Sequence, residues 1–194
     1  MKRVLHNFGG SAVTVGVAAI LVASGLTTLF ALRQNNARML ELRQTVIDAD
    51  ATGHAVYESL AALQSHVTSH MNATPPKLGS EPSIQLKATY DRAKAIEDAN
   101  VSAARNAVAA EAARQCESGS AGQLLSVTAS CVANYTAAHP VNERRIVPDL
   151  YRYDFVSPRW SADLAGWALL VTVGSGLILA ARIVSRFVAK ATLQ

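Results

Sequence analysis

Charged side chains are scarce in this sequence and are missing from two long stretches. They make up 16% of the residues, whereas half of all residues are hydrophobic. No charged residue occurs from Ser11 to Leu32, and none occurs from Leu164 to Ala181. A helix rises about 1.5 Å per residue, and the hydrocarbon core of a bilayer is about 30 Å thick. We therefore predict membrane-spanning helices at residues 11–32 and 164–182, where Arg182 can reach the headgroups.

The sequence also lacks the common motifs of catalytic and nucleotide-binding sites. It contains no G-x-S-x-G, no P-loop, no C-x-x-C and no dinucleotide fingerprint. The absence of ionisable residues inside both spans argues against a proton pump or an ion path. The net charge of +4 is not arranged as a basic stripe with interleaved aromatics, so it does not indicate nucleic-acid binding. We expect no enzyme, no cofactor and no nucleic-acid partner.

The first span follows a short basic segment that is typical of an export signal. Lys2 and Arg3 precede a hydrophobic run longer than the roughly 7–15 residues of a cleaved signal, and no small-residue cleavage site follows it. We interpret the run as an uncleaved signal anchor. Long loops are exported largely regardless of their charge. We therefore expect the tails, residues 1–10 and 183–194, in the cytoplasm and residues 33–163 outside.

Only two cysteines are present, and both lie in the segment predicted to be exported. An even number of cysteines in such a segment favours one disulfide, between Cys116 and Cys131, and the alternative is two buried thiols. A tight helical hairpin between them would leave their Cα atoms farther apart than the 7 Å or so that a disulfide allows. The bond therefore requires a connection that climbs back along the helices.

Proline is absent before Pro75, and the apolar positions in this part follow an alternating spacing of three and four residues. This spacing is typical of a coiled-coil seam, and it predicts a helix that is continuous with the first span up to Thr74, about 90 Å long. Pro75 and Pro76 end it. The seam positions are Met39, Leu42, Val46, Ala49, Gly53, Val56, Leu60, Leu63, Val67 and His70.

Two further helices are expected before the second span. One runs from about Ser83 to Gln115 and is rich in alanine, and another covers residues 120–139. The fold class is therefore all-α: an exported, antiparallel, coiled-coil-like bundle of three helices at residues 33–139. Residues 140–163 contain Pro148, Pro158 and several aromatics, and we predict an extended strap that leads back to the membrane.

Two histidines four residues apart raise the question of a metal site. His66 and His70 would share a helix face, as the ligands of H-E-x-x-H zinc enzymes do, but no glutamate lies between them to act as a base. They remain candidates for a metal site that would need a third ligand from elsewhere. The alternative is that His70 fixes the register of the seam at the tip of the helix, about 60 Å above the bilayer.

Five residues are candidates for contact with lipid. Trp160 and Trp167 fit an interfacial aromatic belt, and the alternative is a platform for a carbohydrate or another ligand. Arg182, Arg186 and Lys190 recur every four residues, which indicates either a stripe that binds anionic headgroups or an ordinary basic flank.

The stretches HMNATPP, IQLKATYDRA and YDFVSPRWSADLAGW resemble uncharacterised two-span membrane proteins of bacteria of the candidate phyla radiation. In architecture alone, over about residues 11–190, the chain is similar to the sensor half of bacterial chemoreceptors. We expect a structural or scaffold component of a cell-envelope assembly, embedded in the bilayer and bound to copies of itself or to another membrane protein. The alternative is an extracytoplasmic ligand-binding module that signals through a partner protein.

Overall fold

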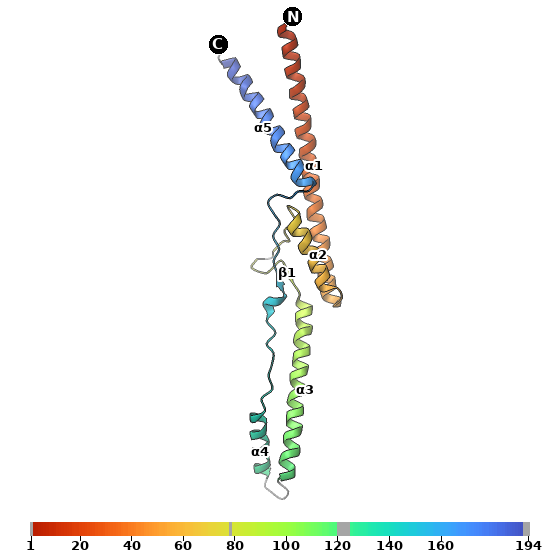
Figure 1. Ribbon diagram of the computed structural model, residues 1–194, viewed down its shortest axis with the longest axis vertical. Coiled ribbons are helices and arrows are strands. Elements are labelled where there is room, and N and C mark those ends of the chain that lie inside the picture. Colours follow the sequence, from red (N-terminus) through yellow and green to blue (C-terminus); the bar gives the residue numbers. More distant parts are fainter. Residues whose placement is uncertain (1, 78, 120–124, 192–194) are drawn as a thin grey trace. The chain divides into compact units, whose positions relative to one another are not determined.

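The fold was determined as a computed structural model that describes residues 2–77, 79–119 and 125–191 (Figure 1). The described chain is mostly helical. Its helices are α1 (Lys2–Thr52), α2 (Val56–Ser69), α3 (Lys87–Gly119), α4 (Leu125–Ala138) and α5 (Leu164–Ala191). A short 3-10 helix, η1 (Pro148–Tyr151), and a two-stranded sheet of β1 (Ile84–Gln85) and β2 (Arg152–Tyr153) complete it.

The chain folds as two compact units. The first comprises residues 1–84 and 153–194 and therefore contains α1, α2 and α5. The second is Gln85–Arg152 and contains α3, α4 and η1. Each unit has its own helix pairs, so each is described by itself.

In the first unit, α1 and α5 are both long and apolar enough to cross a membrane. Figure 1 shows α5 starting beside the middle of α1 and diverging from it toward the chain termini. Small and hydroxylated residues lie where the two helices touch. Thr172 Oγ1 donates a hydrogen bond to Ser24 Oγ (3.0 Å), and a Cβ at Gly25 would lie 3.9 Å from the Thr172 methyl group. Small residues let two helices approach closely in lipid.

The predicted continuous helix from the first span to Thr74 is wrong, because α1 ends at Thr52. Gly53 has a φ of +79° and its N–H bonds to Ala49 O (2.8 Å), which is a glycine-terminated helix end. Ala55 also adopts a left-handed conformation, and α2 then starts at Val56 and runs back along α1. The heptad spacing is satisfied within one chain, as the helical hairpin α1–α2.

Most of the predicted seam positions are buried in this hairpin. Only Leu42, Gly53 and His70 are not. The pattern therefore identified the packed residues but not their partner. The buried seam residues are Met39, Val46, Ala49, Val56, Leu60, Leu63 and Val67.

The second unit is a helical hairpin of α3 and α4. Val101, Ala112 and Cys116 are buried on α3, whereas none of the described side chains of α4, residues 127–138, is buried. Four helical segments thus stand where three were expected between residues 33 and 139, and their main contacts are α1 with α2 and α3 with α4. In the described residues, the three expected helices are therefore corrected to four, which pair as one hairpin in each unit.

Candidate functional site

A group of polar contacts in the first unit joins α1, the second residue after the end of α2 and the start of α5. Asn35, on α1 three residues beyond the predicted span, provides the centre. Its Nδ2 group donates hydrogen bonds to Asp163 Oδ2 (2.9 Å) and to the backbone oxygen of Met71 (3.2 Å). We call Asn35, Met71, Ser161 and Asp163 the polar junction.

Asp163 caps the N-terminus of α5. Its Oδ1 atom accepts hydrogen bonds from the Gly166 N–H (2.9 Å) and from Ser161 Oγ (2.8 Å). A carboxylate three residues before a free helical N–H is a favourable cap. Ser161 Oγ in turn accepts the N–H of Met71 (3.0 Å), so the cap is tied to the residues that follow α2.

The charge state of Asp163 follows from these contacts. Burial raises the pKa of its carboxyl group. The hydrogen bonds from Gly166, Asn35 and Ser161 lower the pKa, and the charge of the nearby His70 lowers it further. The lowering causes outweigh burial, so the pKa lies below the usual value and the carboxylate is ionised at neutral pH.

A glycine is required at position 166, in the first turn of α5, because the loop before the helix lies against it. A Cβ built on Gly166 would lie 1.8 Å from Ser161 O and 2.9 Å from Trp160 Nε1. Any side chain would therefore displace the backbone that carries Ser161. Gly166 therefore packs on the loop before α5.

His66 and His70 lie beside the polar junction and not at the end of a long rod. Helix α2 ends at Ser69, so His70 is its extended C-cap. His66 Nε2 lies 2.9 Å from Asn35 O, and His70 Nδ1 lies 3.0 Å from His66 O. A carbonyl oxygen only accepts, so His66 Nε2 donates to Asn35. His70 Nδ1 also lies 2.9 Å from Ser69 Oγ, and the two rings stack with centroids 4.4 Å apart.

The predicted position of the histidines at the far tip of a continuous helix is thus wrong, because α2 doubles back along α1 and His66 contacts Asn35. One nitrogen of each ring is engaged by a backbone oxygen. Within residues 2–77, 79–119 and 125–191, no group of three or more His, Cys, Asp or Glu side chains could hold a metal ion. The contact of His66 with Asn35 O holds the end of α2 against α1.

Asp154 makes a second set of contacts in the first unit. Its Oδ1 accepts hydrogen bonds from the backbone N–H (2.8 Å) and Oγ (3.1 Å) of Ser83, and its Oδ2 pairs with Lys77 Nζ (2.8 Å). The bond from Lys77 is the main reason that the pKa of Asp154 is lowered, and the Ser83 bonds lower it further. This carboxylate fixes the strap to the linker that follows α2.

Residues 71–83 and 154–161 are joined by side chains in antiparallel order. Between the contact of Met71 with Ser161 and that of Lys77 with Asp154, Thr74 Oγ1 lies 2.8 Å from Ser157 Oγ and accepts the Ser157 N–H (3.0 Å). We call this paired segment the clasp. Prolines at positions 75, 76 and 158 cannot donate backbone hydrogen bonds, so a regular strand pairing would be interrupted here. Side-chain hydrogen bonds join the two segments of the clasp.

Cys116 and Cys131 form a disulfide between α3 and α4. Their Cα atoms lie 5.9 Å apart, within the range for a disulfide, and the S–S distance is 2.02 Å. Cys116 is buried and Cys131 is exposed. The bond fastens a helix that buries none of its own described side chains.

The candidate lipid-contacting residues lie at both ends of α5. Trp160 and Trp167 meet edge to face, with ring centroids 6.0 Å apart, and both are exposed. Arg186 Nη2 donates to Thr14 Oγ1 on α1 (3.3 Å), and Arg182 is half-buried. The side chain of Lys190 lies outside the described part of the structure.

Sequence reasoning did not identify the polar junction or the clasp. Asp163 is the one member of the polar junction that the sequence could have indicated, because an aspartate directly before an apolar run is a typical helix cap. Asn35 and Ser161 have no local signal, since their partners lie far away in the chain. These residues connect segments that are distant in the sequence. In the described part of the chain, every buried side-chain nitrogen or oxygen atom has a hydrogen-bond partner.

The chain matches no family model, no curated protein and no solved structure.

Proposed function

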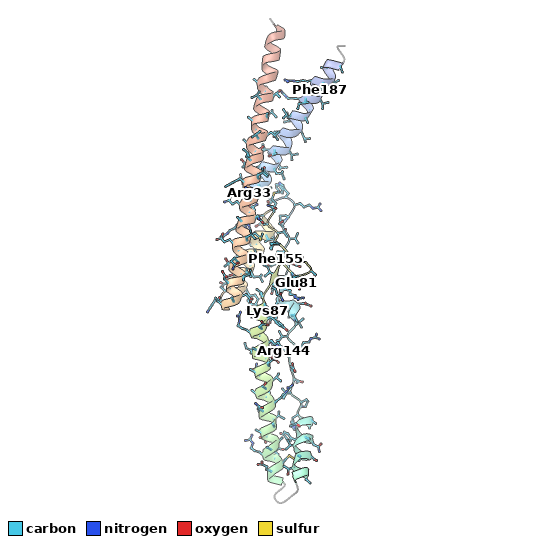
Figure 2. All side chains as sticks on the ribbon, turned by 180° about the vertical axis from the view of Figure 1, so that it is seen from behind. Arg33, Glu81, Lys87, Arg144, Phe155 and Phe187 are labelled. Atoms are coloured by element: carbon cyan, nitrogen blue, oxygen red, sulfur yellow. A yellow bond between two sulfur atoms is a disulfide. The ribbon has the colours of Figure 1, made fainter. Side chains whose placement is uncertain are left out.

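We propose that the chain is an integral membrane protein of a bacterial envelope, with α1 and α5 crossing the bilayer. Large apolar side chains on both helices are exposed, as a lipid surround requires, and they support this proposal. Leu26 is 64% exposed, Phe30 65% and Phe187 70%. Figure 2 labels Phe187 on α5. A core helix of a soluble protein would bury such residues. The disulfide supports a position of residues 33–163 outside the cytoplasm, with both tails inside.

The bilayer contacts form part of the same proposal. Trp160 and Trp167 would lie at the outer headgroup layer, since each ring has an apolar body and a polar edge. Arg182, Arg186 and Lys190 would lie at the inner surface, where anionic lipids attract basic residues. The contact of Arg186 with Thr14 supports an additional role for that residue in holding α5 to α1.

The role that we propose is that of a structural or scaffold component of an envelope assembly. The observation that carries it is the filled interior of the α1–α2 hairpin. Met39, Val46, Leu63 and Val67 are at most 1% exposed and fill the space between the helices. A ligand-binding helical bundle needs a cavity at this place, whereas a spacer needs a filled core. The outer faces of the hairpin are left for other chains, either copies of this one or another membrane protein.

Site-specific photo-crosslinking in intact cells tests this role. A diazirine amino acid at Ile47 or Tyr57, both exposed on the hairpin, should give crosslinked products larger than the monomer. The same group at Leu63, which is fully buried against α1, serves as the matched control and should give only the intramolecular product. Monomer alone from all three positions, together with no co-purifying protein, would contradict the proposal.

A second candidate function is an extracytoplasmic ligand-binding module that signals through a partner. A pocket of about 450 Å³ in the second unit, between α3 and residues 143–146, favours it. This candidate requires that a ligand at the pocket changes the contacts of the first unit with a partner. Crosslinking yields at Ile47 that change when a ligand is added would support it.

A further inference from the structure

The second unit contains a pocket of about 450 Å³ between the first half of α3 and the extended residues 143–146. This volume is within the range of about 300–1,000 Å³ that is usual for sites of small molecules. Figure 2 labels Arg144, which lies on the extended side of the pocket. The lining residues are Tyr90, Lys94, Glu97, Asp98, Glu143, Arg144, Arg145 and Ile146.

Two contacts hold the extended segment against α3. Glu97 Oε1 accepts the backbone N–H of Arg144 (2.8 Å), and Glu143 pairs with Arg105 at 3.7 Å. Both contacts use acidic groups of the pocket wall. They fix the segment that carries the arginines and engage two of the three carboxylates of the lining.

The cations of the pocket have no such partners. In the described part of the chain, the side chains of Lys94, Arg144 and Arg145 make no hydrogen bond or ion pair. Asp98 is the one acidic side chain of the lining that is also unengaged there. The lining therefore holds three cations and three carboxylates. In the described part of the chain, two of the carboxylates have partners and none of the three cations does, in a concave place that is fixed at two points.

We propose that this pocket binds a small anion through a carboxylate or phosphate group. A guanidinium group presents paired N–H donors that match both anions, and Lys94 adds a point charge. Tyr90 and Ile146 supply a partly apolar wall for the remainder of the ligand. The proposal does not depend on the scaffold role, because it concerns the second unit alone.

Calorimetric titration of the full-length protein in a neutral detergent tests the proposal, with inorganic phosphate and succinate as separate probes at constant ionic strength. We expect saturable binding of at least one probe and none of succinamide, its uncharged analogue. Binding of phosphate alone or of succinate alone identifies the anionic group. The absence of saturable binding of either anion overturns the proposal.

Substitutions in opposite directions separate a site from a general effect of surface charge. Arg144→Gln combined with Arg145→Gln should weaken binding by about tenfold or more. Asp98→Asn should strengthen it several-fold, because it removes the unengaged negative charge. Arg114→Gln, on the same helix but outside the pocket, is the matched control and should leave affinity unchanged. An equal loss in the control, or no gain from Asp98→Asn, would show that no defined site exists.

Discussion

Asp163 accepts hydrogen bonds from three donors that belong to three different parts of the chain. One is the first turn of α5, one is the loop before it, and one is Asn35 on α1. A single ionised side chain therefore holds both the start of the apolar helix α5 and its contact with α1. Such a residue stabilises a structure through its charge, so the effect depends on pH.

Acid should weaken the contacts of Asp163 in the polar junction. Because the pKa of Asp163 is lowered in the folded protein, its stabilisation is fully present above the usual carboxyl pKa of about 3.9. It is lost as the pH falls through the lower folded value. We expect the melting temperature of the protein in detergent to fall below about pH 4.

Asp163→Asn isolates this contribution. Asparagine still caps a helix but carries no charge, so the variant should be less stable than the parent at neutral pH, by about 1 kcal/mol. Its melting temperature should also depend less on pH in the acid range. Identical acid profiles for the two proteins would assign the effect to other carboxylates, such as Asp154.

At the scale of elements, the hairpin α1–α2 shows what a heptad pattern does and does not determine. The spacing identified Met39, Val46, Leu63 and Val67 as core residues, and they are buried. The pattern is the same whether the partner helix belongs to another chain or to the next part of this one. Gly53 is a local signal for a turn, but it also fits the heptad spacing, so the pattern alone places it in the seam.

The two arrangements predict different distances. Spin labels at the exposed positions Ala37 and Gln64 would be about 40 Å apart in a continuous helix. In the hairpin they lie on neighbouring helices, whose axes are about 10 Å apart. We expect a short distance in electron paramagnetic resonance, and a distance near the longer value would contradict the hairpin.

Gly53→Val should strain the turn, because a β-branched residue is disfavoured at a positive φ. We expect a loss of unfolding free energy of about 1–3 kcal/mol. Gly53→Asn is the matched control and should cost less, since asparagine tolerates this conformation. Equal stability of all three proteins would show that the turn does not require a positive φ.

The disulfide between Cys116 and Cys131 is the main attachment of α4 to α3. Helix α4 buries none of its described side chains, so apolar packing contributes little to its attachment. Cys116→Ser with Cys131→Ser opens a loop with a sequence separation of 15, which should cost about 3 kcal/mol. Hydrogen exchange should quicken in α4 and stay unchanged in α2. Equal protection of α4 in both proteins would mean that other contacts hold it.

For the whole molecule, the sequence was sufficient to identify the two apolar helices but not how the chain between them folds back. Charge-free runs are local features, and their length alone predicts a span. The polar junction and the clasp depend on residues about 80 to 130 positions apart, such as Thr74 with Ser157 and Asn35 with Asp163. Single polar residues at such separations leave no periodic trace.

The proposed topology has a direct check. A cysteine at Ser59, in the segment placed outside, should react with a membrane-impermeant maleimide in intact cells. A cysteine at Ser185, near the end of α5, should react only after the membrane is permeabilised. Both serines lie outside the buried core, so the substitutions should be tolerated. Labelling in the opposite order would reverse the proposed orientation.

The pairing of β1 with β2 has a consequence for how the gene can be edited. The second unit begins at Gln85 and ends at Arg152, and these residues belong to the two paired strands, with Leu86 N–H bonded to Tyr151 O at 2.9 Å. The ends of this unit are therefore neighbours, as in a domain inserted into a host. Residues 85–152 could be excised and closed with a short turn, or exchanged for another module with adjacent ends. The remaining chain would keep its two apolar helices, its hairpin and its clasp.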